Sequence, residues 1–92
     1  MAEAHRDFDA QSALSRALVA ERLAIDTHDA VARRLDQLAA EMEQHALYDR
    51  DEQLQEHAVE IAAKARERAQ SARERAAAAR QRLREEGFDP GR

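Results

Sequence analysis

The sequence predicts an all-α protein, an antiparallel hairpin of two long helices. The 92 residues include two glycines and one proline, 3% of them are aromatic and 37% are charged. Such a chain has few turn formers and little bulk for a sheet core. Apolar residues recur at helical spacing in the first half, and alanine follows a seven-residue repeat in the second half. Repeats of this kind are typical of helices that pack in pairs.

The first helix is expected over residues 9–47. Its main stripe follows the 3.6-residue period of an amphipathic helix and consists of Leu14, Leu18, Ile25, Ala32, Leu35, Ala39, Met42 and Ala46. A stripe of smaller residues consists of Ala10, Ala13, Ala17, Ala20, Ala24, Thr27 and Val31. A third strip, Phe8, Val19, Leu23 and Ala30, lies on the opposite side of the first half. This helix therefore offers apolar residues to neighbours on two sides.

The chain is expected to reverse at residues 48–50. Asp49 is an acceptable N-cap for a second helix over residues 51–86, and Glu52, three residues later, completes a capping-box spacing. Residues 45–52 contain no Gly or Pro, and Leu47, Leu54 and Ile61 keep a seven-residue step through the turn. One uninterrupted helix in a long dimeric coiled coil is therefore the alternative, and such a rod would exceed about 100 Å.

The second helix carries a seam of small residues in heptad spacing. Its members are Ala58, Ala62, Ala65, Ala69, Ala72, Ala76, Ala79 and Leu83. Alanine lets two helix backbones approach closely. A reversal near residue 49 or 50 places Ala17 and Ala24 opposite the region of Ala76 and Arg82, so we expect the seam to meet the small stripe of the first helix.

The second helix is expected to end at residue 86 or close by, before a C-terminal tail of residues 87–92. Gly87 can take the left-handed position that follows many helices, and Phe88 can then fold back onto Leu83. Pro90 prevents the helix from resuming.

Arginines flank the alanine seam on both edges. They are Arg66, Arg73 and Arg80 on one edge and Arg68, Arg75 and Arg82 on the other. Two copies of this helix would therefore oppose Arg to Arg, which disfavours their pairing. The first helix offers chiefly Asp9 and Glu21 on its own flanks. We expect the arginine stems to cover the seam while their charged heads stay in water, or the arginines to bind an acidic protein partner.

Charge is divided along the chain. Residues 41–60 contain seven acidic residues and one arginine, whereas residues 61–84 contain eight basic residues and two glutamates. The acidic segment of another copy is therefore one candidate partner for the arginines. Nucleic acid is a weaker candidate, because the formal net charge of the protein is −4 and residues 61–84 contain no aromatic residue to stack on bases.

Acidic and histidine side chains suggest a metal site as an alternative. Glu21 and His28 flank Ile25 on the main stripe, where polar groups need a partner or a metal ion. The stretch RDEQLQEHA, residues 50–58, resembles the metal-binding helix of small encapsulated ferritins, which are helical hairpins that dimerise around iron. It departs from that pattern because Leu54, and not Glu, stands three residues before His57. The resemblance implies iron or another divalent metal, and the candidate ligands are Glu21, His28, Glu56, His57 and Glu60.

Several kinds of chemistry have no residues to support them. The chain has no cysteine, which excludes disulfides, thiolate metal sites and thiol nucleophiles. The serines have no nearby base at useful spacing, and the two glycines form no phosphate-binding loop. No apolar run is long enough for a membrane span, and the N-terminus has no secretory signal features, so a cytoplasmic location is expected.

These observations favour a non-enzymatic structural or adaptor protein without a cofactor. Two hairpins are expected to dimerise as a four-helix bundle, because a two-helix monomer has no second layer to cover its wide apolar face. The expected core consists of Leu14, Leu18, Ile25, Leu35, Met42, Leu54 and Ile61. The arginine-lined helix is expected to bind an acidic partner. A ferritin-like metal-binding bundle is the first alternative and a nucleic-acid-binding helical protein is the second.

Overall fold

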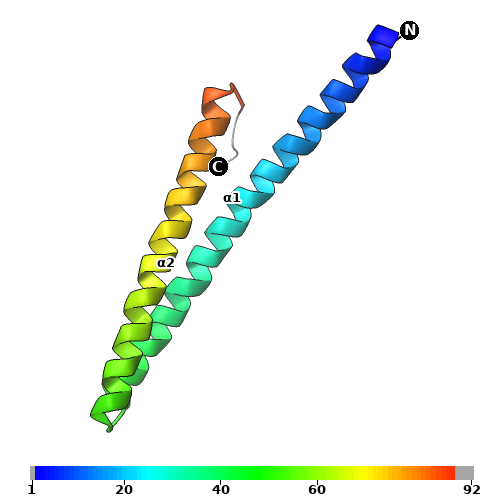
Figure 1. Cartoon of the computed structure of the whole chain (residues 1–92). Helices are drawn as coiled ribbons and strands as arrows, with labels where there is room; N and C mark the ends of the chain where they lie inside the picture. Colours follow the sequence, from blue (N-terminus) through cyan, green and yellow to red (C-terminus); the bar gives the residue numbers. More distant parts are fainter. Residues whose placement is uncertain (1, 89–92) are drawn as a thin grey trace.

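A computed structural model shows two α-helices that run in opposite directions and lie side by side (Figure 1). Helix α1 spans Ala2–Tyr48 and helix α2 spans Glu52–Glu85. The structure describes the backbone of residues 2–88 and the side chains of residues 9–88, and this part of the chain contains no strand. The predicted hairpin is confirmed, and the alternative of one uninterrupted helix is wrong. Helix α1 begins earlier than the expected residue 9.

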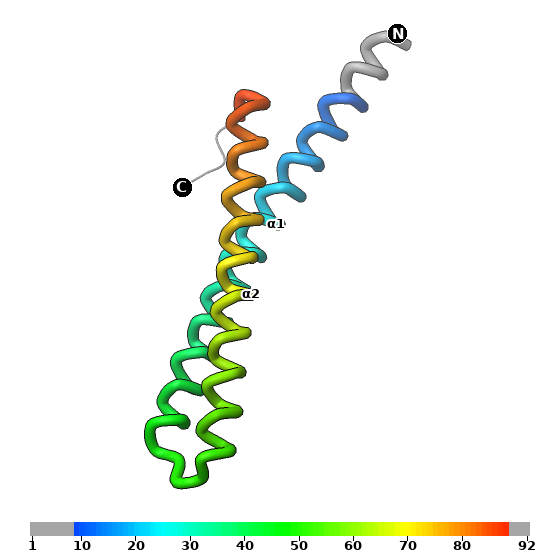
Figure 2. Tube along the Cα trace, turned by 60° about the vertical axis from the view of Figure 1, so that its left-hand side comes forward, coloured from blue at the N-terminus to red at the C-terminus, as the bar shows by residue number. Residues whose placement is uncertain are grey.

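The hairpin is long and thin, with extents of 75 × 20 × 16 Å. Helix α1 continues past the end of α2, and its N-terminal part leads away from α2 in both views (Figures 1 and 2). The chain exposes 7501 Å² of surface. A compact monomer of its mass, 10.4 kDa, would expose about 5,400 Å². Two helices alone therefore leave much of their surface in contact with solvent.

Three residues, 49–51, make the turn between the helices. The backbone N–H of Asp49 donates to the carbonyl oxygen of His45 at 2.9 Å, which closes the last turn of α1. The N-cap of α2 is Asp51, whose Oδ1 accepts from the backbone N–H of Gln53 at 2.9 Å. The expected N-cap, Asp49, is wrong. Its carboxylate instead accepts from the backbone N–H of Asp51 at 3.0 Å and holds the turn, so Glu52 becomes the first residue of α2.

The core is a single seam in which alanines of α2 pack against the main apolar stripe of α1. Ile25 packs with Ala76, Ala79 and Leu83, and Leu18 and Phe88 lie against this cluster. Ala32 packs with Ala69 and Ala72, while Ala39 packs with Ala62 and Ala65. Leu35 and Met42 are partly buried beside these clusters. Every alanine of the predicted seam is buried.

The small stripe of α1 does not face α2, contrary to the expectation. Ala17 and Ala20 are exposed, and Ala24 is only partly buried. If two alanine stripes met, the larger Leu18, Ile25 and Leu35 would face solvent. Packing the alanines of α2 against the larger residues of α1 buries more apolar surface. Each Å² of apolar surface removed from water stabilises the pair by about 25 cal/mol.

The end of α2 forms a Schellman motif. Gly87 has φ +85°, and its N–H donates to the carbonyl oxygen of Arg84 at 3.0 Å. The N–H of Phe88 donates to the carbonyl oxygen of Leu83 at 2.9 Å, and the Phe88 side chain packs against the cluster that contains Leu83. The prediction for Gly87 and Phe88 is confirmed, while Pro90 lies outside the described residues. Over the described range, neither helix has an apolar stretch long enough to cross a bilayer.

Candidate interaction surfaces

One edge of the helix pair is closed by a ladder of ion pairs. Three acids of α1 and three arginines of α2 both step by seven residues, so in an antiparallel pair they meet at successive levels. Arg66 donates to Glu43 at 2.7 Å and Arg73 donates to Asp36 at 2.6 Å. Arg80 pairs with Asp29, and a longer contact of 3.8 Å joins Arg66 to Asp36. We call this edge the ion-pair side.

The expectation that α1 offers chiefly Asp9 and Glu21 to the arginines is wrong. It assumed that the small stripe of α1 faces α2. Because Ile25, Ala32 and Ala39 face α2 instead, the residues four positions later lie on one flank of the contact. These residues are Asp29, Asp36 and Glu43. Their seven-residue spacing, which matches that of the arginines, is the sequence signal that would have identified them.

The rung nearest the turn changes the pKa of both its partners. The hydrogen bond that Arg66 donates to Glu43 holds the pKa of the Glu43 carboxyl below its ordinary value. The same hydrogen bond raises the pKa of the Arg66 guanidinium. About half of each side chain is exposed to solvent. The rungs are therefore expected to align the helices more than to hold them together, since exposed ion pairs contribute about 0.2 to 1 kcal/mol each.

The other edge of the helix pair is open, and we call it the open side. On α1 it contains residues one position before the buried ones, such as Val31 and Leu38. On α2 it contains Ile61 and Arg68, which stand one position before the buried Ala62 and Ala69. Near the turn, a shallow groove is lined by Leu35, Leu38, Ile61, Lys64, Ala65 and Arg68. At the end of the hairpin away from the turn, which we call the far end, there is a second groove. It is lined by Leu14, Ala17, Leu18, Glu21, Arg82, Leu83 and Glu86.

Large apolar side chains remain exposed along the open side. Val31 is 43% exposed and Leu38 is 37% exposed. Leu14, at the far end, and Leu54, near the turn, are about half exposed. Within one chain, the expected core is thus only partly buried, with Ile25 alone fully enclosed. The open side thus carries an apolar band that α2 does not cover, interrupted by the ion pair of Arg82 with Glu21.

The six arginines predicted to bind a partner fall into two groups. Arg66, Arg73 and Arg80 belong to the ion-pair side, and Arg82 donates to Glu21 at 3.1 Å on the open side. No ion pair joins Arg68 or Arg75 to another residue in the described part of the chain. These two arginines, with Lys64, give the α2 edge of the open side its positive charge. Binding of a partner by any of the six stays a prediction.

The residues proposed as metal ligands lie at two ends of one hairpin. Glu21 and His28 lie on α1 toward the far end, where Glu21 accepts from Arg82. The other three lie on the first turns of α2, near the turn between the helices: Glu56, His57 and Glu60. Among residues 9–88, no three His, Cys, Asp or Glu side chains lie close enough together to hold a metal ion. A metal site built from the five predicted residues would therefore need more than one chain.

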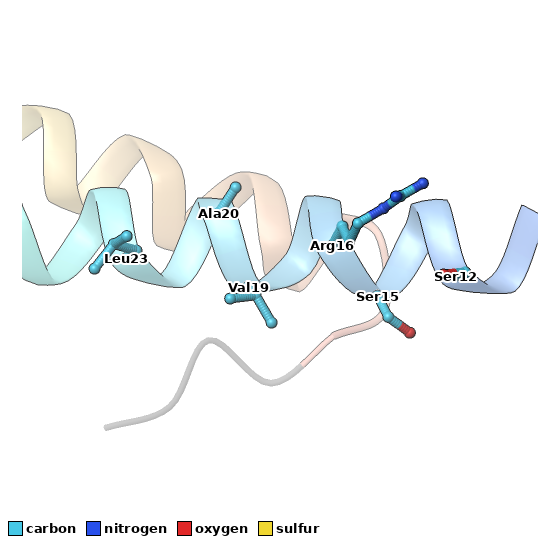
Figure 3. A pocket seen from close by; sticks show the side chains of 6 residues that line it. All are labelled: Ser12, Ser15, Arg16, Val19, Ala20 and Leu23. Carbon is cyan, nitrogen blue, oxygen red and sulfur yellow. The ribbon is translucent and has the colours of Figure 1, made fainter.

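The strip on the outer face of α1 is formed by a single helix. Figure 3 shows Ser12, Ser15, Arg16, Val19, Ala20 and Leu23, all on α1. Val19 is 66% exposed and Leu23 is 64% exposed. Because all six residues come from one helix, the strip has no second wall that could enclose a small molecule. The side chain of Phe8, the first residue of this predicted strip, lies outside the described residues.

Compared with models of protein families, with curated proteins and with solved structures, the chain has no match. Its function is therefore inferred from its own geometry.

Proposed function

We propose that the protein is a non-enzymatic structural or adaptor module that gains a second helical layer by self-association. In this proposal, two hairpins join through their open sides into a four-helix bundle. The arginines and Lys64 at the rim of that side then bind acidic groups of a protein partner. The single observation that carries the proposal is the asymmetry between the two edges of the helix pair. One edge is closed by a ladder of three ion pairs, while the other carries a single ion pair and exposes an apolar band.

Burial favours association at the open side. Leu14, Val31, Leu38 and Leu54 are each between 37% and 53% exposed in the single chain. Covering one such side chain stabilises an assembly by about 1 kcal/mol, given about 1.5 to 3 kcal/mol for complete burial. Four of these residues in each copy supply a sizeable driving force. On the ion-pair side, by contrast, charged groups would lose water if a second copy covered them.

Light scattering and sedimentation of the purified chain test this proposal. We expect the mass of two chains at micromolar concentration. Leu38→Glu puts a charge into the open side and should reduce the mass to one chain, with helical circular dichroism retained. Leu23→Glu is the matched control, because it adds the same charge to the outer face of α1. A mass of one chain for the unmodified protein at every concentration would overturn the proposal, as would an unaltered dimer in Leu38→Glu.

A further inference from the structure

The α1 part of the open side changes in size along its length. Ala10, Ala17, Ala24, Val31 and Leu38 follow one another at seven-residue steps and therefore share a face of α1. Toward the N-terminus this face carries alanine only, and Ala10 and Ala17 are exposed. Toward the turn it carries the larger Val31 and Leu38, which are also exposed. The face is thus narrow at one end and bulky at the other.

We propose that the occupant of this face is α1 of a second copy, running antiparallel, with a two-fold axis beside Ala24. The inference rests on the proposed self-association and specifies its geometry. Around this axis Ala17 of one copy faces Val31 of the other, and Ala10 faces Leu38. On both sides of the axis, where Ala24 faces its own copy, small side chains then oppose large ones and fill the space between the two helices. A parallel pair would oppose Leu38 to Leu38 and Ala10 to Ala10, leaving a wedge-shaped gap.

Two polar residues, Glu21 and His28, lie on either side of the proposed two-fold axis. Glu21 and His28 lie three residues before and four residues after Ala24, and both are partly buried beside the open side. In the antiparallel pair, Glu21 of each copy lies near His28 of the other, so two carboxylate and imidazole pairs form across the axis. The His28 side chain makes no hydrogen bond within the described residues, and one oxygen of Glu21 accepts from Arg82. A second helix would take water from both groups, and each then supplies the partner that the other needs.

A parallel arrangement lacks this complementarity. It would place Glu21 against Glu21 and His28 against His28, which are pairs of like groups. The antiparallel arrangement is therefore favoured by hydrogen-bond complementarity as well as by side-chain size.

The length of α1 beyond α2 fits the same arrangement. At the far end of the hairpin, α1 continues past the end of α2 and has no neighbour there (Figures 1 and 2). The antiparallel pair lays this section, which includes Ala10, along the turn half of the other copy. That half offers the groove lined by Leu35, Leu38 and Ile61. The projecting section of each copy thereby covers the open groove of the other.

Cysteine cross-linking tests the geometry, because the chain contains no cysteine of its own. We expect Ala24→Cys to form a disulfide-linked dimer under mild oxidation at least ten times faster than Ala30→Cys, an exposed alanine on another face of α1. Leu38→Cys alone should not cross-link faster than Ala30→Cys, since its two copies would lie about 40 Å apart. A mixture of Ala10→Cys and Leu38→Cys chains should form the mixed dimer. Each variant is checked for helical circular dichroism before oxidation.

The outcomes separate this inference from the proposal on which it rests. A dimer by mass in which Leu38→Cys links to itself as readily as Ala24→Cys would show a parallel contact and overturn the antiparallel one. A dimer in which Ala24→Cys is no faster than Ala30→Cys would overturn the contact through this face of α1. A mass of one chain at every concentration would overturn self-association itself. In that case, binding of a synthetic amphipathic acidic helix would assign the open side to another protein.

Discussion

Ile25 is the residue on which the stability of the helix pair is expected to depend most. Its side chain is 2% exposed and packs among Ala76, Ala79 and Leu83. Ile25→Ala removes three carbon atoms from this cluster, at about 0.8 kcal/mol for each buried carbon, a loss of about 2.4 kcal/mol. The alanines around it are too short to fill the space, which adds a cavity cost. The higher helix propensity of alanine returns about 0.4 kcal/mol.

The free energy of unfolding should therefore fall by about 2 to 3 kcal/mol in Ile25→Ala. Urea titration followed by circular dichroism at 222 nm measures it, with both proteins at the same concentration because association adds to apparent stability. Leu23→Ala is the matched control, since Leu23 is exposed on the outer face of α1 and should change the value by less than about 0.5 kcal/mol. If Ile25→Ala lost no more than Leu23→Ala, the packing of the main stripe against α2 would be refuted.

Four further predictions concern the ends and the edge of the helix pair. Asp51→Ala should cost about 1 kcal/mol of unfolding free energy by urea titration, and more than Asp49→Ala, because Asp51 caps α2. Gly87→Ala should cost about 1 kcal/mol in the same assay through its positive φ alone, since nothing lies within 4 Å of an added Cβ, and Gly87→Asn should cost less. Asp36→Asn should cost less than about 1 kcal/mol, and the difference should shrink in 1 M salt. The pKa of Glu43 is lowered in the folded chain, so its contribution to stability is present above the ordinary glutamate pKa and is lost as the pH falls through the lowered value. Glu43→Gln should therefore flatten the acid side of the curve of unfolding free energy against pH.

The sequence predicted the features that local rules determine. The alanine seam of α2 could be assigned because a strict heptad leaves one face to bury, and all its members are buried. Gly87 and Phe88 could be placed because a Schellman motif depends on a few consecutive residues. The N-cap was missed because Asp49 and Asp51 are both acceptable caps, and only the path of the chain through the turn decides between them.

The partner of the alanine seam could not be read from spacing alone. Both the main stripe and the small stripe of α1 satisfy a helical period. The choice between them depends on which pairing buries more surface, which is a property of the two helices together. Once Ile25 and Ala32 face α2, the positions of Asp29 and Asp36 follow, and with them the ladder. Because the small stripe was expected to face α2, the ion pairs of Asp29 and Asp36 were not predicted either.

The repeats of α2 raise the question of what fixes its position along α1. Both the alanine seam and the arginine ladder recur every seven residues, so a slide of α2 by one heptad, about 10 Å, would keep most of the alanine contacts and two of the three rungs. Neither repeat alone can therefore set the register. The features that occur once must do so, and they lie at the two ends. At one end the three-residue turn capped by Asp51 is too short to absorb such a slide. At the other end Ile25 packs with Leu83, and Phe88 lies against the same cluster; both are large residues that follow the run of alanines.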